Sequence, residues 1–180
     1  MSEDMSWVKN APSAPSKEDT RLLASRPQEA QDFIDSTKNY GGASMNLQSM
    51  KMAQPGDKMY IVGKEPSKHT GRPVDTAYEN PGQSTLTPRQ FASHFNRLKG
   101  ETSNPSAMMG SWYDKKNKAS KAKGTQIDLS VGYKYKKPAE KKMIERNEDA
   151  AFSMGNMREI RNEAARKRHG ITEPRPPKNN

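Results

Sequence analysis

The sequence contains no cysteine. A chain without cysteine cannot form disulfide scaffolds, thiolate metal sites or thiol nucleophiles. Its three histidines, at positions 69, 94 and 169, do not have the spacing of a metal-binding motif, so we expect no metal and no cofactor. No run approaches the roughly 18 apolar residues of a transmembrane helix, and the first residues do not have the pattern of a signal peptide. We therefore expect no contact with a membrane.

Apolar residues are also scarce. They make up 31% of the 180 residues, and the mean hydropathy is -1.14; a typical globular domain has about 45–50% apolar residues. Ordering the backbone costs roughly 1–2 kcal/mol per residue, which this composition cannot offset along the whole length. We therefore expect an extended N-terminal arm with short helices over 1–57, a compact module over 58–155, and a helical, then disordered, basic tail over 156–180.

The compact module has the clearest strand pattern. Apolar and aromatic residues alternate with polar residues or glycine from 126 to 135, which predicts a half-buried strand. Residues 58–63 and 107–114 are interpreted as two further strands. The fold class that we predict is α+β: a small three-stranded, mostly antiparallel sheet with helices on one face, flanked by extended or disordered termini.

Two helices are expected in the module. Thr87 is a candidate N-cap, and Gly100 can end the helix that follows. A second apolar stripe runs from Met143 to Met154 and predicts another helix there.

The N-terminal arm has a weak helical signal over 18–36, interrupted by Pro27, and then a segment over 37–57 with no periodicity. Apolar residues are spaced along the arm like anchors, and the sequence shows no core for them to fill. Methionine in particular recurs at adaptable binding surfaces. We predict that the following residues dock on other protein subunits: Trp7, Leu22, Leu23, Phe33, Ile34, Met45, Met50 and Met52.

Positive charge is concentrated in one internal segment. The formal net charge is +10, of which residues 115–142 contribute +8. Lysine attracts phosphate without reading bases, because it lacks the planar fork of arginine. The sequence therefore predicts that a polyanion, DNA or RNA, is bound by Lys115, Lys116, Lys118, Lys121, Lys123, Lys134, Lys136, Lys137, Lys141 and Lys142. Tyr133 and Tyr135 stack on bases if they are exposed. The alternative is a solvated hairpin tip, with both tyrosines in the core as their parity predicts.

Catalytic motifs are absent from the sequence. There is no nucleophile elbow, no phosphate-binding loop and no dinucleotide-binding glycine pattern. Asp114, Asp128 and His94 are the only set that we can assemble for a small metal-dependent nuclease or toxin. Turn formation by Asp114 and a solvent-facing position for Asp128 explain the two carboxylates more simply. We therefore expect no enzyme and no small-molecule substrate.

Residues 59–155 resemble small accessory domains that bacteriophages and related mobile elements encode. The resemblance lies in a glycine, an aromatic strand that ends in aspartate, a second strand and a following helix: Gly110, Trp112, Asp114, Ile127, Asp128, Leu129, Ser130, Asn147, Ala150 and Ala151. The lysine-rich hairpin tip of this chain departs from that pattern. The resemblance implies a setting near capsid and portal proteins, and it supplies no active site.

Two functions follow as hypotheses. The leading one is a non-enzymatic structural or accessory subunit of a larger assembly, with a phage virion as the preferred setting. Such a subunit docks by its small module and its extended termini, and it is located in the virion or the host cytoplasm. The alternative is a basic nucleic-acid-binding accessory protein that contacts phosphates through the lysines of residues 115–142.

Overall fold

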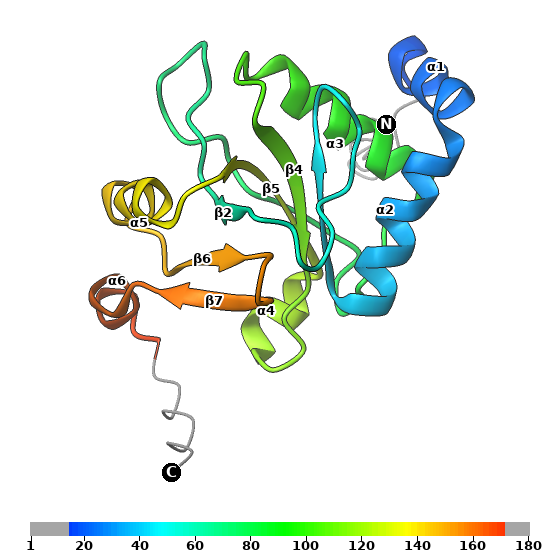
Figure 1. Ribbon diagram of the computed structural model, residues 1–180. Helices are drawn as coiled ribbons and strands as arrows, with labels where there is room; N and C mark the ends of the chain where they lie inside the picture. Colours follow the sequence, from blue (N-terminus) through cyan, green and yellow to red (C-terminus); the bar gives the residue numbers. More distant parts are fainter. Residues whose placement is uncertain (1–14, 172–180) are drawn as a thin grey trace, which may run out of the picture.

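The computed structural model describes residues 15–171, which form six helices and seven strands (Figure 1). The helices are α1 (Lys17–Ser25), α2 (Pro27–Tyr40), α3 (Pro88–Gly100), α4 (Lys118–Lys123), α5 (Lys136–Glu145) and α6 (Glu163–Arg168). The strands are β1 (Gly42–Asn46), β2 (Tyr60–Val62), β3 (Ala77–Glu79), β4 (Ala107–Trp112), β5 (Thr125–Tyr133), β6 (Ala150–Ser153) and β7 (Arg158–Arg161).

The strands form one sheet in which neighbouring strands are antiparallel. Their order is β1-β4-β5-β2-β6-β7, and β3 lies beside the first residues of β5. The structure thus confirms the α+β class and the antiparallel sheet, whereas the prediction of three strands is wrong because there are seven. Strands β1 and β6 escape the sequence pattern because they consist largely of glycine, alanine and serine, and pairing with neighbours holds them extended.

One face of the sheet is covered by helices. Ile127, Leu129 and Val131 of β5 form a core with Phe33 of α2 and Phe91 of α3, whose ring centroids lie 5.3 Å apart. A smaller cluster packs α5 against β2 and β6. Figure 1 shows α1, α2 and α3 together on one side of the sheet, while α5 and α6 lie together beside β6 and β7.

Helix α3 forms where the sequence predicts it. The backbone N–H of Gln90 donates to Thr87 Oγ1 at 3.1 Å, and the backbone N–H of Thr87 donates to Gln90 Oε1 at 2.9 Å. This reciprocal pair is a capping box, which satisfies two amides at the start of the helix. The cap and Pro88 in the first turn are both visible in the local sequence, and the helix starts where they predict.

Residues 15–57 are not an extended arm, which corrects the predicted division into domains. Helices α1 and α2 pack on α3, and β1 pairs along β4. An amphipathic helix buries only one stripe of its surface, so its composition resembles that of an unfolded segment. The folded unit therefore starts before residue 58.

Seven of the eight predicted docking residues belong to the protein's own core or pack directly against it: Leu22, Leu23, Phe33, Ile34, Met45, Met50 and Met52. Phe33, Ile34, Met45 and Met50 are buried in that core, whereas Leu22, Leu23 and Met52 are partly buried and keep some surface exposed. Trp7 lies outside the described residues.

The segment after α5 is also a correction, because it forms a strand hairpin instead of a helix. Asn147, two residues beyond the end of α5, has φ 53°, a left-handed conformation that stops a helix. Strand β6 then pairs with β2 and with β7, so Ala151 lies opposite Ile160. Sheet pairing outweighs the helix propensity of the alanines in β6, and the predicted tail from 156 contains β7 and α6.

The second face of the sheet, which we call the open face, carries the polar residues of β5. Residues in register on antiparallel strands point to the same side. The odd-numbered residues of β5 face the helices, so Gln126, Asp128 and Ser130 lie on the open face. Trp112 is the partner of Gln126 on β4, and Gly110 is the partner of Asp128.

Candidate functional site

A groove of about 940 Å³ hollows the open face. Strands β1, β4, β5 and β2 form its floor, and α2, the loop before β2 and the β6–β7 hairpin form its rims. The hollow exists because several floor residues are small, among them Ser44, Gly63 and Gly110. Gly42 makes room for an aromatic ring, since a Cβ at this position would lie 3.2 Å from the indole of Trp112.

The groove is acidic although the whole chain is basic. Among the described residues, its lining contains no lysine, arginine or histidine. It contains six carboxylates: Asp32, Asp35, Asp128, Glu148, Asp149 and Glu159. Three of them have a cation of this chain beside them: Lys64 at Glu148, Arg161 at Glu159 and His169 at Asp149. Asp32, Asp35 and Asp128 are in no ion pair with a described residue, so the groove keeps an excess of negative charge that attracts cationic groups and repels anions.

Asp128 lies at the floor of the groove, against the backbone of Gly110. A Cβ at Gly110 would lie 2.4 Å from Asp128 Oδ1, so only glycine leaves room for this carboxyl group. Asp128 keeps part of its surface exposed to the groove, but the surrounding protein atoms desolvate the carboxyl and raise its pKa. A hydrogen bond from the Gln126 side chain lowers the pKa and only partly opposes this effect.

Glu148 approaches the same point of the floor. A Cβ at Gly63 would lie 3.4 Å from Glu148 Oε1 and 3.5 Å from Asp128 Oδ2. Burial raises the pKa of Glu148, the Lys64 ammonium lowers it, and the carboxylates of Asp128 and Asp149 raise it further. Lys64 Nζ lies 3.8 Å from Glu148 Oε1. Asp128, in contrast, forms no ion pair with a described residue. The floor is therefore short of positive charge.

The second candidate feature is a projection between β4 and β5, formed by residues 115–123 and containing α4; we call it the knob (Figure 1). Asp114 Oδ1 accepts from the backbone N–H of Lys116 at 2.9 Å and of Asn117 at 3.2 Å. The side chain of Asn117 in turn caps α4. Asp114 is therefore engaged in a turn at the start of the knob.

The base of the knob packs against the loop that follows β3. Gly124 has φ 95°, and a Cβ there would lie 2.2 Å from the carbonyl oxygen of Glu79, so glycine is required. The backbone N–H of Gly82 donates to the carbonyl of Lys121 at 3.0 Å, and the Tyr113 hydroxyl donates to the carbonyl of Gly82 at 2.8 Å. These contacts hold the knob in one position.

Strand β5 separates the ten predicted polyanion-binding lysines into two clusters. Its nine residues span about 27 Å. The knob carries Lys115, Lys116, Lys118, Lys121 and Lys123, and the far end of β5 carries Lys134, Lys136, Lys137, Lys141 and Lys142.

The two clusters differ in their ion pairs. Lys136 pairs with Glu140 at 3.6 Å, and Lys142 pairs with Glu145 at 3.0 Å. In contrast, no lysine of the knob forms an ion pair with a residue in the span 15–171. The knob is therefore the less neutralised of the two clusters.

Exposed tyrosines accompany both clusters. Tyr78 of β3 is 41% exposed, and Lys123 Nζ lies 5.1 Å from the centroid of its ring. Tyr135 is 64% exposed, and Lys134 Nζ lies 5.4 Å from its ring centroid. Tyr133 is instead half-buried and packs against both core clusters. Of the two tyrosines considered for base stacking, only Tyr135 presents its ring to solvent.

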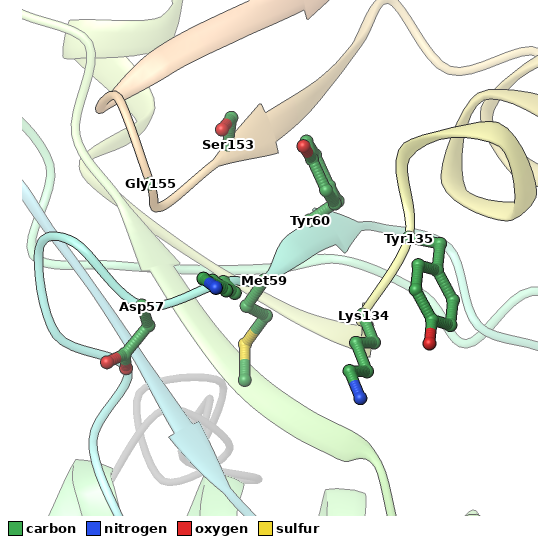
Figure 2. Close-up of a pocket in the computed structure, with 8 residues that line it drawn as sticks. Asp57, Met59, Tyr60, Lys134, Tyr135, Ser153 and Gly155 are labelled. Atoms are coloured by element: carbon green, nitrogen blue, oxygen red, sulfur yellow. The ribbon is translucent and has the colours of Figure 1, made fainter.

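A smaller hollow, of about 430 Å³, lies at the start of β2 and the ends of β5 and β6. Figure 2 shows Met59 and Lys134 pointing to one side of the strands and Tyr60 pointing to the other. Its charged lining residues have both signs, Asp57 against Lys58 and Lys134. This hollow has no strong excess of either charge, so it is a weaker candidate for an ionic ligand than the groove.

The three residues of the nuclease hypothesis do not meet. His94 Nε2 lies 2.9 Å from Glu79 Oε1 on the helix-covered face, Asp128 lies on the open face, and Asp114 lies in its turn. Within residues 15–171, no group of three or more His, Cys, Asp or Glu side chains is placed to hold a metal ion. In the same span, the helices are too short or too polar to cross a membrane.

Sequence reasoning identified the knob but missed the groove. The alternation in β5 places Asp128 on an open face, and this was the only local signal. Asp32 and Asp35 on α2 and Glu148 after α5 reach the groove only through tertiary packing. Tyr78 likewise joins the knob only because β3 pairs with β5.

The candidate site thus consists of two features of opposite charge, an acidic groove and a basic knob. Comparison of the chain with protein-family models, with curated proteins and with solved structures found no match.

Proposed function

We propose that this chain is a non-enzymatic accessory protein of a larger assembly, and that it binds nucleic acid through phosphate contacts made by the knob. The observation that supports this proposal is the set of five lysines on the knob, none of which forms an ion pair with a described residue. No described carboxylate neutralises these ammonium groups, and each contact with a phosphate releases counterions from the nucleic acid.

The fixed backbone of the knob favours binding. Its base is held by the close packing of Gly124 on Glu79 and by the hydrogen bond from Gly82 to Lys121. A preorganised segment loses less conformational entropy when it binds than a flexible tip would. The lysines are therefore presented to a polyanion from a defined surface.

Tyr78 favours a single strand as the form of nucleic acid. Its exposed ring lies beside the knob, with Lys123 over one face. Unpaired bases stack on exposed aromatic rings, and this stacking is tolerant of sequence. The carboxylates of the groove repel phosphates. The single-stranded nucleic acid therefore passes on the side of the knob that faces β3 and not across the groove.

A labelled single-stranded oligonucleotide tests the proposal by fluorescence anisotropy. We expect the affinity to fall steeply between about 50 mM and 200 mM salt, because phosphate contacts release counterions. The variant K121E/K123E is expected to lower the affinity about tenfold or more. In a plot of the logarithm of the affinity against the logarithm of the salt concentration, we expect its slope to be less steep by about 1–2.

Lys137 and Lys141 on α5 provide a matched control. They are exposed and in no ion pair with a described residue, and K137E/K141E changes the net charge by the same amount. Because β5 separates the clusters by more than the Debye length of about 10 Å, we expect this control to change the affinity less than about twofold. Equal losses in both variants, or no binding at low salt, would contradict the proposal.

We propose that the chain belongs to a larger assembly, but not that extended arms attach it there, because the described part of the N-terminal segment is folded. A phage virion is the narrower form of this proposal, and only the resemblance over residues 59–155 supports it. Docking on neighbouring subunits then falls to surfaces of the folded unit, and the open face offers a groove for it.

A further inference from the structure

The groove and the knob are complementary surfaces on one chain. The groove gathers six carboxylates and no basic side chain in its lining, and the knob carries five lysines. We propose that two copies of this chain associate through their open faces, with the knob of each copy seated in the acidic groove of the other. This inference goes beyond nucleic-acid binding and does not depend on it, but a knob that is seated in a groove does not contact phosphate at the same time.

The charges on the floor of the groove support a cationic occupant. Asp128 and Glu148 approach one point beside Gly63, and of the two only Glu148 has an ion pair with a described cation, Lys64. A lysine from a second copy would supply the missing counter-charge at Asp128. A partly desolvated carboxylate gains more from such a partner than an exposed one, because the local dielectric is lower.

The groove is also large enough to admit the helix of the knob. Helix α4 has six residues, so it is about 9 Å long and about 10–12 Å wide with its side chains, a volume of about 700–1,000 Å³. The groove has a volume of about 940 Å³. The groove is therefore large enough to receive α4 of a second copy.

The position of the knob allows a closed pair. Trp112 and Gln126 line the groove, and they form the last pair between β4 and β5 before the knob. Because the two features adjoin, a twofold arrangement fills both grooves at once and leaves neither open for further copies. Trp112, which is 45% exposed, would be covered in this pair.

The net charge of each copy sets the conditions under which the pair forms. Two copies at +10 each repel at long range. At about 0.1 M salt the Debye length is about 10 Å. The long-range repulsion between the two copies is therefore screened more strongly than the attraction between knob and groove, whose charges are in contact. At about 1 M salt it is about 3 Å, and the contacts are weakened as well.

Sedimentation equilibrium of the full chain tests the proposal. At about 0.1 M salt we expect twice the mass of one 20.2 kDa copy at high protein concentration, and a return to one copy at about 1 M salt. Two variants separate the surfaces: K118E/K121E/K123E reverses the knob, and D32K/D35K/E159K reverses exposed positions on the rims of the groove.

Each variant alone is expected to stay a monomer. In K118E/K121E/K123E, a knob with three glutamates and two lysines meets a groove that is still acidic, and in D32K/D35K/E159K, three lysines balance the three remaining carboxylates, so the groove no longer attracts the knob. An equimolar mixture is expected to regain the pair, since the basic knob of D32K/D35K/E159K meets the acidic groove of K118E/K121E/K123E, and the glutamates of the second knob face the lysines on the rims of the second groove. Lys99, Lys137 and Lys141 are exposed and lie outside the lining of the groove, so K99E/K137E/K141E is the matched control and should still pair.

Three results would overturn the proposal. They are a wild-type chain that stays monomeric at about 0.1 M salt, a control variant that dissociates as fully as the knob variant, and no recovery of the pair in the mixture. The first result is measured on the wild-type chain, so it tests the proposal even if a variant fails to fold. Oligonucleotide binding by D32K/D35K/E159K separates this inference from the proposed function, since that variant keeps its knob.

Discussion

The carboxyl group of Asp128 lies against Gly110, with Glu148 beside it and a hydrogen bond from Gln126. Desolvation raises its pKa above the usual value of 3.8, so the folded protein binds this proton more tightly than the unfolded chain. The free energy of unfolding therefore falls as the pH rises from the ordinary carboxyl range through the raised pKa. Glu148, whose pKa is raised by burial as well, acts in the same direction.

Replacement of Asp128 by asparagine tests this assignment at the scale of one residue. Asparagine keeps the shape of the side chain and removes a partly desolvated charge. We expect D128N to have a higher Tm than the wild type at neutral pH, and the difference to vanish as the pH falls to about 3.8 and below. Thermal unfolding at both pH values measures it.

Asp75 lies exposed in a loop, so D75N is the control for the change in chemistry. Its effect on Tm is expected to be small at both pH values. A D128N variant that is less stable than the wild type at neutral pH would show that the charge of Asp128 is satisfied in the folded protein.

At the scale of the element, sequence patterns succeeded where a segment carries its own signals. Helix α3 has its cap in Thr87 and its apolar stripe within thirteen residues, and β5 shows its alternation over nine. Strands β1 and β6 carry no such signals, because their extended form depends on partners that are distant in sequence. Local patterns therefore predicted the centre of the sheet and missed its margins.

The cap of α3 gives a prediction at this scale. Thr87→Ala removes the acceptor of the Gln90 backbone amide, and we expect it to lower the free energy of unfolding by about 1 kcal/mol. Ser93 is exposed in the middle of the same helix, so S93A is the control and should change stability by less than about 0.5 kcal/mol. Urea unfolding measures both variants. Equal stabilities of T87A and the wild type would show that water replaces the cap.

At the scale of the whole molecule, the main core joins α2, α3, β1, β4 and β5, and a smaller cluster joins α5, β2 and β6. Phe33 of α2 is fully buried and contacts Phe91 of α3, although the sequence analysis placed it on an arm. Helix α2 therefore shares its stability with β5 and α3, and the three are expected to unfold together.

Phe33→Ala tests this arrangement. A large side chain removed from a core costs about 3–5 kcal/mol, so we expect a loss of this size in urea unfolding of the isolated protein. Tyr40 lies on the same helix and is 84% exposed, so Y40A is the control, with an expected change below about 0.5 kcal/mol. A docking arm would predict no loss in either variant.

The sequence by itself determined the α+β class, helix α3, strand β5 and the basic knob, because each of these depends on neighbours within about ten residues. The acidic groove was decided by the tertiary structure alone. Its carboxylates come from α2, β5 and the β6–β7 region, and only the sheet brings them to one surface. The division of the lysines into two clusters was likewise decided by β5, whose length keeps them apart.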